Sequence, residues 1–330
     1  MDADGTVLVL VELRRDQQIT PLSLECVTAA KRLAARRGGR TAALMMGKGV
    51  AAVAAELACY GIDDVVLVDH PDLDDYQPER YVGAFLQVCE RLKPRAILMG
   101  DSLLAVDMAP RIAFALDAGL VTDCVAIEVD GSEVSVIKPV YSSNIIAAYG
   151  FASEPWIVSL RARAHEAAVK EETRRSQVFS IQVELDSSLA KTAVIRRVVE
   201  RDEGVDLAQA QIIVAGGRGI GGPDGFEQVT QLAKVLNAAV GASRPPCDLG
   251  WAPPQSQVGQ TGAKVAPAVY IAAGISGAAQ HLAGMQNAKT IVAINKDPRA
   301  NIFRIADYGV VGTCEEVLPA FRQALTDMPR

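Results

Sequence analysis

Short apolar runs alternate with amphipathic segments along the first third of the chain. Residues 6–13, 40–46, 64–70 and 95–101 are rich in Val, Ile, Leu, Ala and Met, and each run precedes a segment with apolar residues at helical spacing. Continuous apolar runs of this length are typical of strands buried on both faces, as in parallel sheets covered by helices. The pattern therefore predicts an α/β domain with a parallel sheet.

The pattern changes at Cys124, where apolar runs follow one another without helical segments between them. Residues 124–131, 133–141, 144–151 and 155–162 are rich in Val, Ile and Tyr and are separated by turn residues. Such spacing is typical of consecutive strands. We therefore expect an antiparallel edge that completes the first domain.

The alternation restarts after a charged segment, residues 194–207, which we interpret as the bridge between two domains. A further strand of the first domain is expected at 178–186. We place an N-terminal α/β domain, which contacts any partner subunit, at 1–200 and a C-terminal domain with a Rossmann-like parallel sheet at 201–330. The strands expected in the second domain are 211–217, 238–244, 268–274, 290–297 and 307–312, and the helices are 226–238, 276–285 and 315–328.

Polar side chains follow four of the strands expected in the second domain. Arg218 follows the first strand, Ser243 and Arg244 follow the second, Ser276 the third, and Asn295 the fourth. The carboxyl ends of parallel strands lie at one edge of a sheet, where open α/β sheets bind ligands. Each arginine either binds an anionic ligand or forms a surface salt bridge, and the pattern leaves both open.

Small residues connect the third strand to its helix in the segment GISGAAQHLAGM, residues 274–285. Gly274 and Gly277 allow a ligand to approach the backbone, and the first N–H groups of a helix that begins near Ser276 are unpaired and favour an anion. The segment therefore predicts a phosphate or pyrophosphate site. His281 lies more than one helical turn after Ser276, so it faces either the ligand edge or the core.

Two other motifs of the second domain carry less specific information. Residues 216–222, GGRGIGG, match GxGxxG, but Pro223 to Gly225 are expected to extend the loop and no acidic residue ends the following strand, so we do not interpret them as a dinucleotide fingerprint. The long loop 245–262 contains QVGQTG, whose amide and hydroxyl groups can recognise the edge of a heterocycle.

Composition excludes several classes of protein. The 330 residues include 33 Lys and Arg against 39 Asp and Glu, a net charge of −6, whereas nucleic-acid-binding proteins cluster basic residues. We expect no nucleic-acid partner. No apolar run is long enough to span a membrane, and the acidic N-terminus is unlike a signal peptide. The six cysteines are scattered without a CxxC pair, which favours a cytoplasmic location and no metal site.

The run VYIAAGISGAAQHLAGMQNAKTIVAINKDPRANIFRIADYGVVG, residues 269–312, resembles the signature of the electron-transfer flavoprotein alpha subunit. VAGGRG, VGASR and VGQTG precede it in the order and at the spacing of that family, and the resemblance covers about residues 205–320. It implies a heterodimer with a beta subunit and an FAD held mainly by the C-terminal domain. It also implies AMP or a second FAD in the beta subunit.

The resemblance further implies which residues bind FAD. They are Arg218, Ser243, Arg244, Val258, Gly259, Gln260, Thr261, Ser276, Gly277, Ala278, Ala279, Gln280, His281, Asn295, Thr313 and Cys314. By resemblance, Thr261 is expected near flavin N5, His281 near the O2 side of the ring and Arg244 against the isoalloxazine. The positive charge of Arg244, with any on His281, would then stabilise reduced flavin. Many relatives have Asp-Leu where this chain has Thr313 and Cys314, so the adenine side lacks that carboxylate.

The implied activity is that of a redox carrier between a flavoprotein dehydrogenase and an acceptor, either a quinone oxidoreductase or a ferredoxin or flavodoxin. Residues 109–124 are similar to the nitrogen-fixation and anaerobic branch of the family, so an alternative is an electron-bifurcating flavoprotein that oxidises NADH. The residues also leave two other classes open. These are an NAD-dependent enzyme with Lys296 as a covalent amine and a nucleotide-binding regulatory module.

Overall fold

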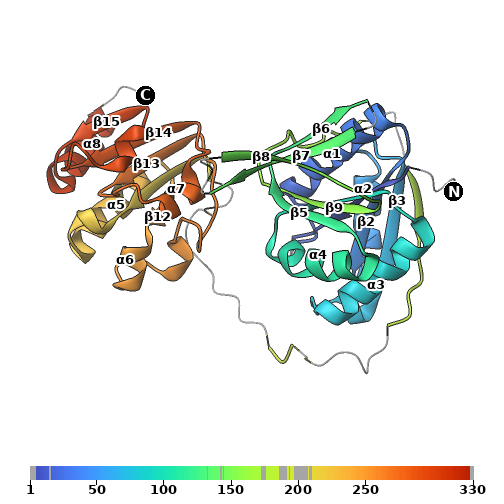
Figure 1. The fold of residues 1–330 in the computed structure, drawn as a ribbon. Coiled ribbons are helices and arrows are strands. Elements are labelled where there is room, and N and C mark those ends of the chain that lie inside the picture. Colours follow the sequence, from blue (N-terminus) through green and yellow to red (C-terminus); the bar gives the residue numbers. More distant parts are fainter. Residues whose placement is uncertain are drawn as a thin grey trace. The chain divides into compact units, whose positions relative to one another are not determined.

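The computed structural model describes the chain from Gly5 to Asp327, except residues 15, 132, 142, 144, 172–175, 186–191, 193, 197–206 and 208–209. The chain forms two compact units, Met1–Arg197 and Val198–Arg330, which are drawn in Figure 1 and are described one after the other. The predicted bridge at 194–207 lies mostly outside the described residues.

The first unit contains a seven-stranded sheet with the strand order β10-β3-β2-β1-β4-β9-β5, and every neighbouring pair is parallel. The predicted apolar runs form its central strands, which are buried along their length. The strands are β1 (Val7–Val11), β2 (Thr41–Gly47), β3 (Asp64–Asp69), β4 (Ala96–Gly100), β5 (Gly119–Cys124), β9 (Trp156–Leu160) and β10 (Gln177–Ser180).

Helices cover both faces of this sheet, which is why its strands are apolar on both sides. The helices are α1 (Pro21–Arg37), α2 (Ala51–Leu57), α3 (Pro78–Leu92) and α4 (Leu103–Leu116), with a 3-10 turn at Pro71–Leu73. Val7, Val9 and Val11 of β1 join the core formed with α1 and α2, whereas Leu8 and Leu10 join the core formed with α3 and α4.

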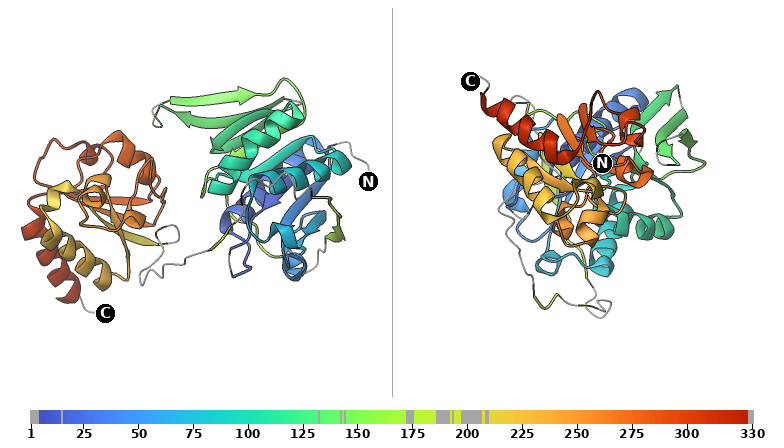
Figure 2. Two further views of the ribbon diagram at one scale, coloured as in Figure 1. Left: turned by 90° about the horizontal axis from the view of Figure 1, so that it is seen from below. Right: turned by 90° about the vertical axis from the view of Figure 1, so that its left-hand side faces the viewer.

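The predicted antiparallel strands are present and form a sheet of their own. β6 (Ala126–Asp130), β7 (Glu133–Val140) and β8 (Ile145–Gly150) pair in sequence order, and Figure 2 shows them in light green, apart from the seven-stranded sheet. β9 was expected among these strands, but it joins the parallel sheet between β4 and β5. β5 had not been expected, because Thr122 and Asp123 interrupt its apolar pattern.

The second unit contains a five-stranded parallel sheet with the strand order β12-β11-β13-β14-β15. The strands are β11 (Ile212–Gly216), β12 (Ala239–Ala242), β13 (Val269–Ala273), β14 (Thr290–Asn295) and β15 (Tyr308–Val311). Numbered within the unit, this order is 2-1-3-4-5. The strand order of such a sheet reverses between its first and third strands, and ligands bind in the crevice there. The crevice is therefore expected beyond the carboxyl ends of β11 and β13.

The two faces of this sheet are covered differently. α5 (Pro223–Val235) and α8 (Cys314–Asp327) pack on one face, whereas the short helix α7 (Ala279–Met285) and the irregular segment around Val258 and Val265 cover the other. The remaining elements are α6 (Arg244–Asp248) and 3-10 turns at Arg218–Ile220, Pro254–Ser256 and Asn301–Arg304.

Two predicted helix starts were wrong by a few residues. α5 begins directly at Pro223, because proline is well suited to the first helical position, so residues 223–225 do not extend the loop. α7 begins at Ala279, so Ser276 lies in the turn before the helix and not at its start.

Candidate functional site

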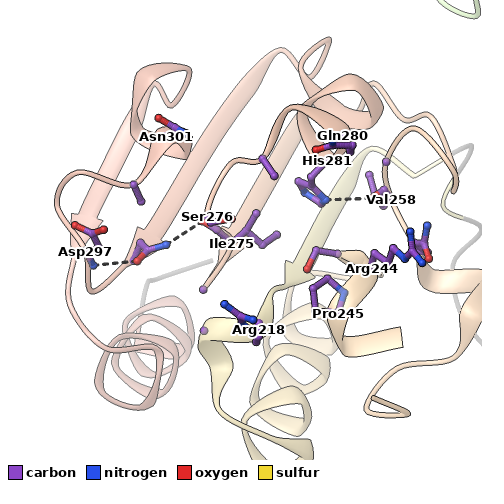
Figure 3. Close-up of a pocket in the computed structure, with 18 of the residues that line it drawn as sticks. Arg218, Arg244, Pro245, Val258, Ile275, Ser276, Gln280, His281, Asp297 and Asn301 are labelled. Carbon is purple, nitrogen blue, oxygen red and sulfur yellow. Dashed lines mark hydrogen bonds between the residues drawn. The ribbon is translucent and has the colours of Figure 1, made fainter. Parts of the chain in front are cut away.

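A cavity of about 920 Å³ opens at the carboxyl edge of the second unit's sheet. Its walls come from the segments that follow β11, β12, β13 and β14, and from the loop 257–261. Figure 3 shows Arg218, Ser276 and His281 on different sides of this space. The lining residues are Arg218, Gly219, Ser243, Arg244, Pro245, Gln257, Val258, Gly259, Gln260, Thr261, Gly274, Ile275, Ser276, Ala278, Gln280, His281, Asn295, Lys296, Asp297, Arg299, Ala300 and Asn301.

Close packing of two glycine-rich segments forms the floor of the crevice between β11 and β13. A Cβ atom on Gly217 would lie 2.7 Å from the carbonyl carbon of Gly274, and one on Gly219 would lie 2.9 Å from the Gly274 Cα. The Gly219 N–H donates to the Gly274 carbonyl at 2.9 Å. Gly217 and Gly219 of the GGRGIGG segment are thus required for contact with the segment after β13, which explains these two glycines without a dinucleotide fingerprint.

The turn between β13 and α7 presents free main-chain donors to the cavity. Gly274 and Gly277 have φ values of 63° and 82°, a region that favours glycine. Among the described residues, the N–H groups of Ser276, Gly277 and Ala278 donate no hydrogen bond. Successive unpaired N–H groups in such a turn form a concave anion-binding site. The turn therefore suits a phosphate group, although the donors belong to the turn and not to a helix that starts at Ser276.

The side chain of Asn295 supports this turn from the neighbouring strand. Its Nδ2 donates to the Ile275 carbonyl at 2.9 Å, and its Oδ1 accepts from the Asp297 N–H at 2.9 Å (Figure 3). One residue at the end of β14 thereby fixes the segments that follow two adjacent strands. Asn295 lines the cavity, but its main role is structural, because both its amide nitrogen and its amide oxygen form hydrogen bonds within the protein.

Four cationic residues line the cavity, Arg218, Arg244, Lys296 and Arg299, and two of them are predicted site residues. Arg218 is exposed and, within the described part of the chain, forms no ion pair. Arg244 begins α6, and its Nε lies 3.1 Å from Asp248 Oδ2, with side-chain exposures of 70% and 59%. An exposed pair of this kind contributes little to stability, so it leaves the Arg244 guanidinium available to a ligand.

His281 faces the core and the cavity at once, and it is neutral. Its side chain is buried, with Nδ1 3.0 Å from the Val258 carbonyl oxygen and Nε2 3.1 Å from the Tyr270 hydroxyl. Burial lowers the pKa of His281 to about 4, an effect that the hydrogen bond with Val258 partly opposes. The expected positive charge on His281 is therefore absent in this structure.

The loop 257–262 supplies polar side chains to the same wall. Gln257 Nε2 donates to Thr261 Oγ1 at 2.9 Å, and Gln260 is exposed on the same turn. The loop is attached to β12 by the Val258 N–H, which donates to Ala242 at 2.8 Å, and to α7 by the Gln260 N–H, which donates to Gln280 at 2.7 Å. Rigid attachment of this kind suits a loop that recognises a ligand.

Twelve of the sixteen predicted site residues line the cavity, and four do not. Gly277 lies between the lining residues Ser276 and Ala278 in the turn, and Ala279 is the first residue of α7. Thr313 and Cys314 lie at the start of α8, where Thr313 Oγ1 donates to Glu316 at 2.8 Å and Cys314 is buried against α5. Burial raises the pKa of the Cys314 thiol to about 11.

Sequence reasoning placed Lys296 and Asp297 at this edge with Asn295 but missed Arg299, Ala300 and Asn301, which continue the wall beyond β14. Their position after a strand of the same parallel sheet was the available signal. Lys296 lies on this rim with an exposed side chain. An exposed ammonium lacks the desolvation that makes a lysine nucleophilic, so the structure does not support Lys296 as a covalent amine.

No helix among the described residues is long and apolar enough to cross a membrane. No group of three or more His, Cys, Asp or Glu side chains within the described ranges is placed to hold a metal ion.

Comparisons with known proteins agree with one another. The family model of the electron transfer flavoprotein domain matches residues 7–186, and that of the electron transfer flavoprotein FAD-binding domain matches residues 206–286. The chain is 39% identical over 308 residues to the electron transfer flavoprotein subunit alpha of Thermoanaerobacterium thermosaccharolyticum, covering 93% of each protein. It is 40% identical over 315 residues to that of Bacillus subtilis, covering 95% of each. It is also 34% identical over 304 residues to the lactate dehydrogenase (NAD+, ferredoxin) subunit LctC of Acetobacterium woodii, covering 92% of this chain and 72% of that protein.

Proposed function

This chain belongs to the electron transfer flavoprotein alpha subunit family, and from that premise we propose that it carries electrons on an FAD held in the cavity of the second unit. The observation that carries the proposal is the crevice between β11 and β13, where Arg218 and main-chain N–H groups that have no partner among the described residues line one cavity. An anionic cofactor with a diphosphate and a heterocycle requires these groups together.

The residues present fit FAD. A cavity of about 920 Å³ lies within the range of roughly 300–1,000 Å³ typical of ligand sites. The free N–H groups of Ser276, Gly277 and Ala278, with the guanidinium of Arg218, would hold the diphosphate. The donors around the loop 257–261 would recognise the polar edge of the isoalloxazine ring.

Arg244 is the residue that would tune the bound cofactor. FAD, when bound, takes up and releases electrons one or two at a time. Reduction adds negative charge to the ring, and a fixed guanidinium beside it lowers the free energy of that charge. Burial lowers the pKa of His281 to about 4, so the positive charge at the cavity comes from Arg218, Arg244, Lys296 and Arg299 and not from His281.

The proposal includes the partners of a carrier. The family implies a heterodimer with a beta subunit, in which we expect AMP or a second FAD. A flavoprotein dehydrogenase is the proposed donor, and a quinone oxidoreductase, ferredoxin or flavodoxin is the proposed acceptor. We place the protein in the cytoplasm, where its six free thiols are compatible with a reducing environment. Thr313 and Cys314 are left out of the FAD site, because their side chains are engaged at the start of α8.

A second candidate function is electron bifurcation. The relative from Acetobacterium woodii carries NAD+ and ferredoxin in its name. The bifurcating alternative involves the same two redox partners, because it oxidises NADH and reduces ferredoxin or flavodoxin. In that case a second flavin in the beta subunit would exchange hydride with NAD(H), and the FAD of this chain would carry electrons onward.

One experiment separates these functions. The chain is purified with its beta subunit, the cofactors are released, and FAD and AMP are counted per heterodimer. One FAD with one AMP supports the simple carrier, and two FAD support bifurcation. Absence of flavin after reconstitution with FAD would contradict both.

A further inference from the structure

We propose that Tyr270 is a positioning residue for the FAD site: with His281 it forms a neutral, buried lock that holds the loop 257–262 in place on the cavity wall. This inference rests on the proposed function for its ligand, whereas the lock itself is a property of the chain. Tyr270 does not line the cavity and is not among the predicted site residues. It acts through His281.

The lock joins three separate segments. Tyr270 lies in β13 with 0% exposure, His281 lies in α7 with 6% exposure, and Val258 begins the loop that follows α6. The two hydrogen bonds of the imidazole connect all three, at 3.1 Å to the Tyr270 hydroxyl and 3.0 Å to the Val258 carbonyl. Figure 3 shows the bond to Val258. A single side chain thus ties the ligand-facing loop to the centre of the sheet.

The positions of the protons follow from what each atom can do. A carbonyl oxygen only accepts, so His281 Nδ1 carries the proton and donates to Val258. A neutral imidazole then has a lone pair on Nε2, and the Tyr270 hydroxyl is left to donate to it. All polar groups of the lock are satisfied, which a fully buried network needs in order to be stable. Burial raises the pKa of Tyr270 and lowers that of His281, with no charged side chain contributing, so both groups stay neutral.

The lock fixes the positions of Gln260 and Thr261 on the cavity wall. Other backbone bonds that hold the loop include the Val258 N–H to Ala242 in β12 and the Gln260 N–H to Gln280 in α7. A Cβ atom on Gly284 would lie 2.5 Å from the Cα of Gly259, so α7 and the loop are in direct contact at that point. Removal of the Tyr270 hydroxyl leaves a buried Nε2 without a donor, and the imidazole then turns or takes up water, which releases the loop.

The test uses two tyrosine-to-phenylalanine variants of the heterodimer. Tyr270→Phe removes the hydroxyl of the lock. Tyr81→Phe is the matched control, because Tyr81 is also buried and its hydroxyl also donates one hydrogen bond, to Leu73 at 2.8 Å, in the first unit. FAD affinity is measured by flavin fluorescence. We expect Tyr270→Phe to weaken FAD binding about tenfold and Tyr81→Phe to leave it unchanged. Equal affinities in the two variants would overturn the positioning role.

A second readout does not depend on FAD. The chain has three histidines, so 15N-histidine labelling gives three imidazoles, and His70→Gln and His165→Gln variants identify the signals of His281. In the FAD-free heterodimer we expect His281 to be neutral and protonated on Nδ1 from pH 5 to pH 8. Protonation on Nε2, or a titration within that range, overturns the lock even if Tyr270→Phe fails to fold. If the wild-type protein binds no FAD, the proposed function fails, and this spectrum still decides whether the lock exists.

Discussion

Gly277→Ala offers a direct test of how the FAD turn is built. Gly277 has a φ of 82°, and its Cβ would lie 2.7 Å from the Cα of Ile302 and still closer to the Ile302 nitrogen. That nitrogen donates to the Ser276 carbonyl at 3.1 Å, so the added methyl group forces apart two segments that are hydrogen-bonded to each other. The contact is with backbone, which cannot rotate away.

The size of the effect follows from two contributions. An L-residue in the left-handed region costs about 1–2 kcal/mol, and overpacking against a fixed neighbour costs about 1–3 kcal/mol. Gly277→Ala is therefore expected to lower the free energy of unfolding of the second unit by about 2–5 kcal/mol. Gly221→Ala separates the contributions, because Gly221 has a φ of 89° but its Cβ would find only a Glu315 oxygen at 4.0 Å. For Gly221→Ala the free energy of unfolding is expected to fall by only about 1–2 kcal/mol.

Urea unfolding can be followed in the second unit alone. Trp156 and Trp251 are the two tryptophans, so a Trp156→Phe background leaves Trp251 as the reporter. FAD affinity is measured on the same proteins, and we expect it to fall for Gly277→Ala and to persist for Gly221→Ala, since Gly221 does not line the cavity. If the two variants lose equal stability, the neighbouring backbone yields freely and the steric argument is refuted.

Three further predictions concern charge at the cavity. Arg218→Ala removes a charge-assisted contact with the diphosphate and is expected to weaken FAD binding by about 10- to 100-fold, with a reduced dependence on salt; equal binding by titration would exclude Arg218 from the site. Arg244→Ala is expected to lower the flavin midpoint potential, because the charge added by reduction loses its partner; an unchanged potential by spectroelectrochemistry would remove this role. His281 has a folded-state pKa of about 4 against an ordinary 6.5, so the unfolded state binds the proton more readily, and the contribution of His281 to stability is lost as the pH falls from about 6.5 to about 4. The free energy of unfolding of wild type and of His281→Gln is measured at pH 7 and pH 5 to check this. The difference in free energy of unfolding between the two proteins should be smaller at pH 5.

The interior strands and most helices were predictable from the sequence because their signals are local. β1 to β4 are apolar runs buried on both faces, and glycine or proline residues mark several of their boundaries. The candidate site was predictable for a related reason. Once the strands are taken as parallel, Arg218, Ser243 and Ser276 must lie at one edge of the sheet, whatever the details of the loops.

The sequence was least informative where long-range pairing decides the outcome. The sequence of β9 is compatible with an antiparallel sheet and with a parallel one. Only its pairing with β4 and β5 shows that it belongs to the parallel sheet. Thr313 and Cys314 follow β15 just as Ser276 follows β13. However, β15 is the last strand of the sheet, away from the crevice between β11 and β13, and the two side chains pack within α8 and against α5.

The amino-acid sequence by itself determined the alternation of strands and helices, the carboxyl edge as the ligand side, and the family. The tertiary structure decided the charge and the partners of the residues at that edge. His281 is neutral because Val258 and Tyr270, 23 and 11 residues away, surround it in the core. The glycines after β11 are needed because Gly274 packs against them. Periodicity records which face a residue presents, whereas burial and hydrogen bonding depend on what the rest of the chain brings to that face.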